Sequence, residues 1–351
     1  MNAVIDTDAP SPSRVAPHPT HKFQLLLKRE FWEHKGGFFW APIWAASISL
    51  VLATMVIVTL LGFAHHASPD GVQVDGQQVM INGLDLSLLT SKLDADGMRN
   101  VAGGIDIFSM ASTLWPMVVL VFVVFFYCLG NLYDERKDRS VLFWKSLPVS
   151  DRDTVLSKAV SALVVAPSLA VSAAIACMFG HLLLISVVAL LYHGNPYTLI
   201  WGPGSPLKVA ASLVAMIPVY ALWALPTVGW LMLCSAWARS KPFLWAILIP
   251  LFSGIVIAWF KTMNLFHLDA AWFWRYIVGR GLLSVIPGSW YANPAMHGSL
   301  QHIDNPGDFV NAIQIGKSWA IFGTVELWVG AFAGAAMIFA AIRLRRWRDD
   351  N

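Results

Sequence analysis

Charged residues are scarce in this sequence. Asp, Glu, Lys and Arg make up 13% of its 351 residues, whereas hydrophobic residues make up 57%. Ordinary soluble domains carry about 25% charged residues, so this balance excludes a typical water-soluble domain. The mean hydropathy of +0.60 agrees with that conclusion. The composition predicts an integral membrane protein, and the 17 Trp residues, mostly at the ends of apolar runs, fit its interfacial belts.

Catalytic and metal-binding motifs are also missing. The three cysteines show neither metal-ligand spacing nor an obvious disulfide pattern, and His65-His66 has no third ligand at a useful spacing. There is no His-Glu-x-x-His and no Gly-x-Ser-x-Gly. Residues 311–318 match P-loop spacing except that Asn311 replaces the first glycine, and they fall on the predicted outer side. We therefore expect no catalytic site, no metal site and no bound cofactor in this chain.

The chain is expected to begin with a disordered cytoplasmic tail. Residues 1–20 contain Pro, Ser and Asp but no apolar core, which argues against a signal peptide. Between His21 and Lys35, Phe23, Leu27 and Phe31 recur every four residues among charged residues. This pattern predicts an amphipathic helix that lies at the membrane surface.

Six apolar segments are long enough to cross a membrane. Residues 159–192 carry no charge, and as one helix they would measure about 51 Å against a hydrocarbon core of about 30 Å. Two crossings would need about 40 residues plus a turn, so one long span is the better interpretation. The predicted spans, within one domain covering residues 21–351, are residues 38–62, 109–133, 159–192, 209–237, 243–260 and 319–342.

Two longer connections are predicted on the outer side of an all-α membrane protein. Residues 63–108 are polar, and Asp75-Gly76 between short β-prone runs predicts a β-hairpin in a small extracytoplasmic cap. A short helix is expected near residues 84–93. The other connection, residues 261–318, is too apolar in its middle for a free loop. We predict interfacial or re-entrant helices there, over about 270–290 and ended by Pro287-Gly288.

Basic residues predict the orientation. Six spans place both termini on one side, and 17 of the 24 Lys and Arg fall on that side. The positive-inside rule then assigns both termini to the cytoplasm.

The most informative stretch is the connection between the second and third predicted spans, residues 134–154. Between residues 134 and 158, six basic and five acidic residues surround an apolar knot of Val141, Leu142, Phe143, Trp144 and Leu147. Such a helix can dock on a soluble partner or lie along the lipid surface. A solvated loop that only follows the positive-inside rule explains the same pattern, and periodicity leaves these alternatives open.

The order of residues in this stretch is similar to that of a known family. Glu135, Arg139-Ser140, Leu142, the run Leu147-Pro148-Val149-Ser150 and Lys158 follow one another at specific intervals. This order resembles the first cytoplasmic loop of type-2 ATP-binding-cassette (ABC-2) permeases, the membrane subunits of ABC exporters. Many members have Gly-Thr where this chain has Arg139-Ser140. The resemblance covers the loop strongly and the six-span layout more loosely.

The resemblance implies that the loop is a coupling helix seated in a groove of a separate ATPase subunit. Its apolar side chains would form the anchor and its charges the rim. The implied contact residues are Glu135, Arg136, Asp138, Arg139, Ser140, Leu142, Phe143, Trp144, Leu147 and Pro148. ATP and Mg would bind the partner. The resemblance also implies a second permease subunit (a homodimer or a close paralogue), contact with membrane lipid, no nucleic acid, and the bacterial inner membrane.

One acidic residue, Glu326, falls inside a predicted span. It follows Trp319 by seven residues and would lie about 10 Å from the outer end. A central charge costs several kcal/mol in lipid, so Glu326 should face protein or water. It either lines the substrate path or outer gate, or is a structural acid, protonated or paired with Arg275 or Arg280. The sequence leaves both readings open.

The predicted function is a permease subunit that couples ATP hydrolysis by a partner to movement of an amphiphilic, lipid-like or peptide substrate. The resemblance implies outward transport and no enzymatic site in this chain. The alternative is a stand-alone integral membrane protein, either a lipid-modifying enzyme or a sensor, with no ATPase partner.

Overall fold

The computed structural model describes residues 19–67, 72–74, 77–79, 94–138, 150–263, 269–293 and 315–348. These residues are predominantly helical, and six of their helices are long and apolar enough to cross a membrane. The prediction of a helical protein with six candidate spans is therefore confirmed, and the six helices indicate a multi-pass membrane protein.

The first half of the chain builds three of the long helices. A short antiparallel pair of strands, with Val72 opposite Val79, follows the first. The elements are α1 (Pro19–Glu33), η1 (Gly36–Trp40), α2 (Ala41–Ala67), β1 (Val72–Val74), β2 (Gln77–Val79), α4 (Ala95–Ala111), α5 (Leu114–Gly130), α6 (Tyr133–Lys137), α8 (Asp151–Val160), η3 (Ser161–Val165) and α9 (Ala166–Leu191).

The second half contributes the other three long helices and the short helical segments between the last two. The elements are η4 (Tyr197–Trp201), α10 (Pro206–Trp223), α11 (Leu225–Trp237), α12 (Pro242–Thr262), α13 (Ala270–Phe273), η5 (Trp274–Gly279), α14 (Arg280–Leu283), η6 (Ser289–Ala292), α16 (Ile315–Trp319), η8 (Ala320–Gly323) and α17 (Val325–Arg348).

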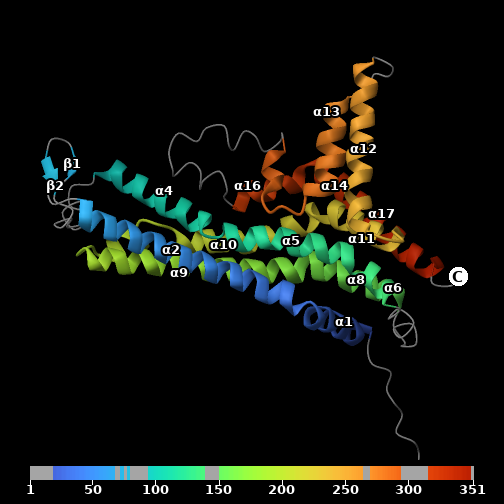
Figure 1. Ribbon diagram of the computed structural model, residues 1–351, viewed down its shortest axis with the longest axis horizontal. Coiled ribbons are helices and arrows are strands. Elements are labelled where there is room, and N and C mark those ends of the chain that lie inside the picture. The colour runs from blue at the N-terminus through green and yellow to red at the C-terminus, as the bar shows by residue number, and fades with distance from the viewer. Residues whose placement is uncertain are drawn as a thin grey trace, which may run out of the picture.

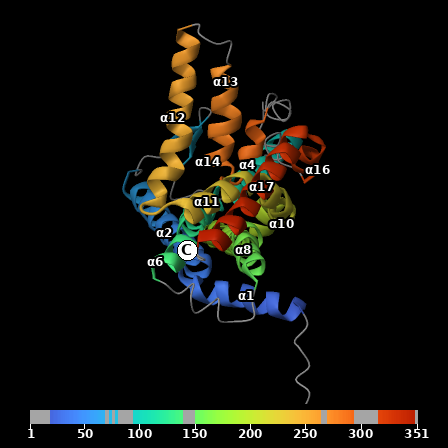
Figure 2. The same ribbon diagram turned by 90° about the vertical axis from the view of Figure 1, so that its right-hand side faces the viewer.

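Most long helices run along one axis, and α12 does not. In Figure 1, α2, α4, α5, α9 and α10 follow the long axis of the molecule, whereas α12 stands out across it beside α13 and α14. Figure 2 shows α1 lying crosswise at the end of the bundle, below α8 and the C-terminal end of α17. The two ends of the described chain, α6 and the start of α8 thus gather at one end of the bundle, called the α1 end below.

The third span is continuous. α8, η3 and α9 join into one helix from Asp151 to Leu191, about 61 Å long, so the expected span over residues 159–192 is part of one long helix up to Leu191. Ser150 begins it as N-cap: its Oγ accepts a hydrogen bond from the Asp153 N–H at 3.1 Å, and acidic residues in the first turn suit the helix dipole. The π-helical turn ends at Val165, two residues before Pro167, whose missing N–H disturbs the regular hydrogen-bond pattern.

Three boundaries differ from the sequence-based expectation. α4 begins at Ala95 and leads into α5, so residues 95–108, expected in the outer cap, are helical. The expected fourth span divides at Ala224, because Pro226 cannot continue the hydrogen bonding of α10. The last long helix starts at Val325 rather than Trp319, after a 3₁₀ turn. Residues 84–93 and the Asp75-Gly76 turn lie outside the described residues.

Helices α11 and α17 pack with their backbones nearly touching. A Cβ atom on Gly229 would lie 2.5 Å from the Gly334 carbonyl oxygen, and one on Gly334 would lie 2.4 Å from the Leu225 carbonyl oxygen. Small residues permit such close approach, as they do between helices in membranes. Around this crossing lies the core, with Val228, Leu231 and other apolar side chains fully buried.

The outer faces of several helices are strongly apolar. On α2, Val51, Met55, Val58 and Phe63 each expose more than half of their surface. Apolar patches of this extent are unusual on soluble monomers and fit contact with lipid or protein.

Candidate functional site

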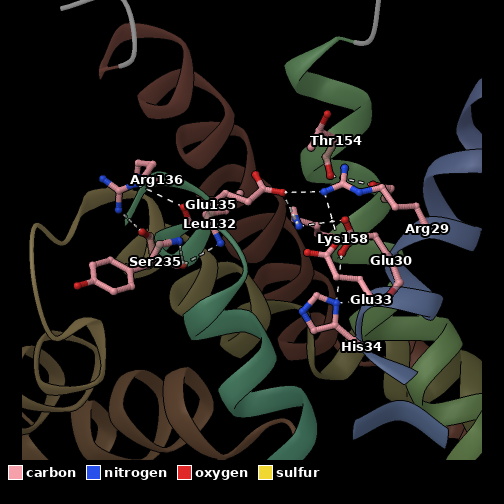
Figure 3. Close-up of polar contacts among 12 residues, drawn as sticks. Arg29, Glu30, Glu33, His34, Leu132, Glu135, Arg136, Thr154, Lys158 and Ser235 are labelled. Atoms are coloured by element: carbon pink, nitrogen blue, oxygen red, sulfur yellow. Dashed lines mark hydrogen bonds and ion pairs between the residues drawn. The ribbon is translucent and has the colours of Figure 1, made fainter. Parts of the chain in front are cut away.

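A buried ion cluster lies at the α1 end of the bundle. Lys158 on α8 places its Nζ 3.0 Å from Glu30 Oε1 and 3.0 Å from Glu135 Oε1. The three side chains come from α1, α6 and α8 and are almost completely buried, with Glu30 at 0% and Lys158 at 1% exposure. Figure 3 shows them converging between the helices. Charges so far from water persist only when they are paired and hydrogen-bonded.

Two arginines complete the pairing of Glu135. Arg345 on α17 donates from Nη1 to Glu135 Oε2 at 2.8 Å, and its Nε lies 3.3 Å from Asp151 Oδ1. From the other side, Arg29 Nη2 lies 3.4 Å from Glu135 Oε1. A single carboxylate on α6 therefore contacts cations from α1, α8 and α17.

Glu30 has two further neighbours. The Tyr127 hydroxyl on α5 donates to Glu30 Oε2 at 2.9 Å. The His34 ring packs edge-on against Tyr127, with centroids 4.7 Å apart, and its Nδ1 lies 3.8 Å from Glu30 Oε2. These residues, together with Lys158, define the ion cluster as Arg29, Glu30, His34, Tyr127, Glu135, Asp151, Lys158 and Arg345.

Arg136 fixes the other side of α6. Its guanidinium donates to the main-chain oxygens of Ser235 and Ala238 at the end of α11. The Ser235 hydroxyl in turn accepts from the N–H groups of Leu132 and Tyr133, at 3.2 and 3.0 Å. These bonds attach the start of α6 to α11, as Figure 3 shows.

The ion cluster connects five helices next to the point where α6 leads toward α8. α1, α5, α6, α8 and α17 all contribute to it, and residues 139–149 join α6 to α8. Breaking a buried ion pair by removing one partner typically costs about 3–5 kcal/mol, because a charge is left without compensation. A displacement of α6 or α8 would therefore pull on its partners in α1 and α17.

The structure places the implied contact residues in different environments. The Glu135 side chain points into the ion cluster and is 7% exposed, so it is not the exposed rim charge that was expected. Its three cationic neighbours account for this position. Arg136 is partly buried against α11, and Asp138 is exposed. Arg139, Ser140, Leu142, Phe143, Trp144, Leu147 and Pro148 lie outside the described residues.

Sequence reasoning missed three members of the ion cluster as partners of Glu135 or of one another. No sequence pattern paired Glu30 or Arg345 with another residue, and Lys158 entered only as the last residue of the loop pattern. The available signal was that Lys158 directly precedes a long uncharged run, where a lone charge needs a partner.

Glu326 lies inside the last candidate span, Val325–Trp347, as expected, but at its very start. It is in the first helical turn, where the helix dipole favours a negative charge. The expected distance of about 10 Å from the end of the span was counted from Trp319, whereas the 3₁₀ turn delays the start of the span to Val325, one residue before Glu326. Asn293 donates a hydrogen bond to its carboxylate. The carboxylate, as a hydrogen-bond acceptor, also raises the pKa of the nearby Tyr276 phenol.

Neither expected arginine pairs with the Glu326 carboxylate. Among the described residues, no ion pair within 4 Å joins Glu326 to Arg275 or Arg280. Arg280 donates instead from Nη1 to the main-chain oxygen of Glu326 at 2.6 Å, and its guanidinium stacks 3.8 Å from the centre of the Trp223 ring. Arg275 is exposed. The arginine thus binds the backbone of α17 rather than its acidic side chain.

A cavity of about 730 Å³ adjoins this group, between α11, α12, η5, α14 and the start of α17. Its wall includes Tyr276, Arg280 and Glu326 among mostly apolar side chains. Within the described residues, no cluster of three or more His, Cys, Asp or Glu is arranged to hold a metal ion.

Comparison with known proteins gives no match: no protein family, no curated protein and no solved structure is similar to the chain.

Proposed function

We propose that this chain is the membrane subunit of an ATP-binding-cassette exporter, which couples ATP hydrolysis by a separate ATPase subunit to outward movement of an amphiphilic, lipid-like or peptide substrate. The proposal starts from the residue order Glu135, Arg139-Ser140, Leu142, Leu147-Pro148-Val149-Ser150 and Lys158. ATP and Mg belong to the partner in this arrangement.

The observation that carries the proposal is the attachment of the loop to the bundle. Both helices that flank residues 139–149 contribute to the ion cluster, α6 through Glu135 and α8 through Asp151 and Lys158. A merely solvated loop needs no such attachment. A loop that transmits the movement of a bound partner needs this attachment. If the flanking helices were loosely held, they would shift without moving the rest of the bundle.

The contacts support a route from the loop to the bundle. A partner that pushes on residues 139–149 moves α6 and α8 against Arg345 on α17 and Glu30 on α1. Because these pairs are buried, separating them is costly, and the helices move together instead. α17 then carries the displacement to the cavity at its other end, where Glu326 lies.

The finer assignments belong to the same proposal. α1 lies on the cytoplasmic surface of a bacterial inner membrane, both termini are cytoplasmic, and the connections between α2 and α4 and between α12 and α17 face outward, the second with an interfacial or re-entrant helical segment. A second permease subunit completes the membrane part. The gathering of both described chain ends at the α1 end supports a common side for the termini.

The test is purification of the tagged chain from its native membrane, scored for a co-purifying protein with a Walker motif and for ATPase activity. The double variant Phe143→Ala and Trp144→Ala should lose the partner, because truncating a buried aromatic anchor costs on the order of 2 kcal/mol or more. Trp115→Ala, at an exposed position of α5, is the matched control and should retain it. If the chain purifies without any ATPase, this result would instead support the alternative function, a stand-alone membrane protein.

A further inference from the structure

The cavity beside α17 has one long apolar wall. Glu326, Val329, Gly330, Ala333 and Met337 line it from one face of the helix. At 1.5 Å per residue, this stripe extends about 16 Å from its first member to its last. All of its members after Glu326 are apolar. The wall is therefore charged at one end and apolar along the rest of its length.

The opposite walls are also apolar in one part and polar near Glu326. Trp230 from α11 and Ile249 and Pro250 from α12 add apolar surface. Tyr276 and Arg280 come from η5 and α14 and lie beside Glu326, as the contacts at the start of α17 show. A volume of about 730 Å³ is in the range of small-molecule sites in proteins, about 300–1,000 Å³.

Arg280 carries a charge that no carboxylate of the described residues neutralises at contact distance. Its Nε and Nη2 are buried and have no hydrogen-bond partner. The guanidinium is confined between the Trp223 ring and Gly330. A Cβ added to Gly330 would lie 2.5 Å from Arg280 Nη2. Unsatisfied buried donors are uncommon in proteins, and each requires an explanation. Both atoms have almost no accessible surface, so an anion in the cavity is attracted by the charge of the guanidinium rather than bonded to these two donors.

The balance of charge at this end is positive. Among the described residues, Glu326 is the only acidic one in the cavity wall, and it already accepts a hydrogen bond from Asn293. Arg280 lies in the wall and the exposed Arg275 is nearby on η5. The N-terminus of the 24-residue helix α17 points its positive dipole end at the same place.

We propose that this cavity binds an amphiphile with a single acyl chain and an anionic head group. The chain lies along the apolar face of α17 between Val329 and Met337, and the head group lies near Arg280 at the start of the helix. The net positive charge of Arg275, Arg280 and Glu326 selects an anion over a cation or a neutral alcohol. Burial of the chain among Trp230, Ile249 and Ala333 supplies the affinity.

The binding experiment uses the purified full-length chain in nanodiscs of zwitterionic lipid. A photoreactive analogue of dodecanoate is the probe, and mass spectrometry locates the labelled peptides. Labels should concentrate on η5, α14 and the first half of α17. Dodecanoate should displace the probe at a concentration at least tenfold lower than dodecanol or dodecyltrimethylammonium. Equal displacement by all three, stronger displacement by the cation, or labelling spread evenly over α2 would overturn the proposal.

Two variants test whether the probe binds in the cavity rather than elsewhere on the molecule. A Cβ on Gly281 meets open space, so Gly281→Phe fills the cavity without a backbone clash and should reduce labelling about tenfold. Gly104→Phe on α4, also in open space and remote from the cavity, is the matched control and should label like the wild type. Unchanged labelling of Gly281→Phe would refute the site.

The role of the charge is tested at Arg280 itself. Arg280→Gln should weaken dodecanoate competition about tenfold, whereas Arg280→Lys, which retains the charge, should stay within about threefold of the wild type. Equal weakening in both variants would refute selection by charge. All these measurements use the chain without an ATPase, so their failure leaves the proposed function standing, and the absence of an ATPase partner would not affect them.

Discussion

Replacing Lys158 with methionine tests the ion cluster most sharply. Lys158 Nζ contacts two carboxylates, Glu30 and Glu135, at 3.0 Å each. Methionine preserves most of the length and apolar volume of the side chain but removes its charge and its donors. Glu135 retains Arg345 as a partner. Glu30, with no exposed surface, loses its closest cation and retains the Tyr127 hydroxyl and the more distant His34.

The structure sets both the size and the sign of the effects. Removing one partner of a buried pair costs about 3–5 kcal/mol, so Lys158→Met should be strongly destabilising. Because most of this cost is the stranded charge of Glu30, adding Glu30→Gln should restore part of the loss. The coupling between the two changes should be on the order of 1–3 kcal/mol, as found for residues in one network. The double variant should thus be more stable than Lys158→Met alone.

The assay is thermal unfolding in detergent micelles, followed by loss of the monodisperse peak in size-exclusion chromatography. A loss of several kcal/mol should lower the apparent Tm by roughly 5–10 °C. Lys208→Met removes an exposed lysine on α10 and should leave the Tm unchanged. A Tm for Lys158→Met equal to that of Lys208→Met, or a double variant less stable than the single one, would refute the assigned role of Lys158.

Two further changes probe helix packing. Gly334→Ala puts a Cβ 2.4 Å from the Leu225 carbonyl oxygen and should destabilise the fold by about 3 kcal/mol, measured by the same thermal assay. Gly316→Ala, with open space around its Cβ, should change stability by less than about 0.5 kcal/mol, and equal effects would argue against the close crossing. Asp106→Ala removes acceptors for the Ser205 N–H at 2.7 Å and hydroxyl at 2.6 Å, at a cost of about 2 kcal/mol. Asp106→Asn retains one acceptor and should cost less; the opposite order would contradict the hydrogen-bond assignment.

The long helices could be predicted from the sequence because apolar length is a local property. Their boundaries depend on fewer residues. The break before α17 is a 3₁₀ turn ending at Gly323, and averaging hydropathy over a long window conceals it. Pro226 did mark the division between α10 and α11, but a proline is also compatible with a kinked single span.

The ion cluster could not be predicted in the same way. Its pairs join residues separated by 128 positions for Lys158 and Glu30 and by 210 for Arg345 and Glu135. Each of these residues, taken alone, matches the pattern of a solvated charge near a span end. Only their convergence shows that they are buried. The likeness of the loop to the coupling segment of a known family indicated Glu135 as important, but placed it on the exposed side of its helix.

The same limit applies to Glu326 and Arg280. The sequence singled out both residues because charges are rare among so many apolar residues. It suggested an ion pair between them, whereas the guanidinium binds the Glu326 carbonyl oxygen and stacks on Trp223. A sequence pattern does not show whether an arginine binds the carboxylate of an acidic residue or the main-chain carbonyl of the same residue.

The central claim is that residues 139–148 contact an ATPase. Photo-crosslinking in the native membrane tests it directly, with benzoylphenylalanine in place of Trp144. We expect a covalent adduct between this chain and a protein that carries a Walker motif. The same photoreactive residue in place of Trp115 on α5 should give no such adduct. Adducts of position 144 with lipid alone would contradict the account.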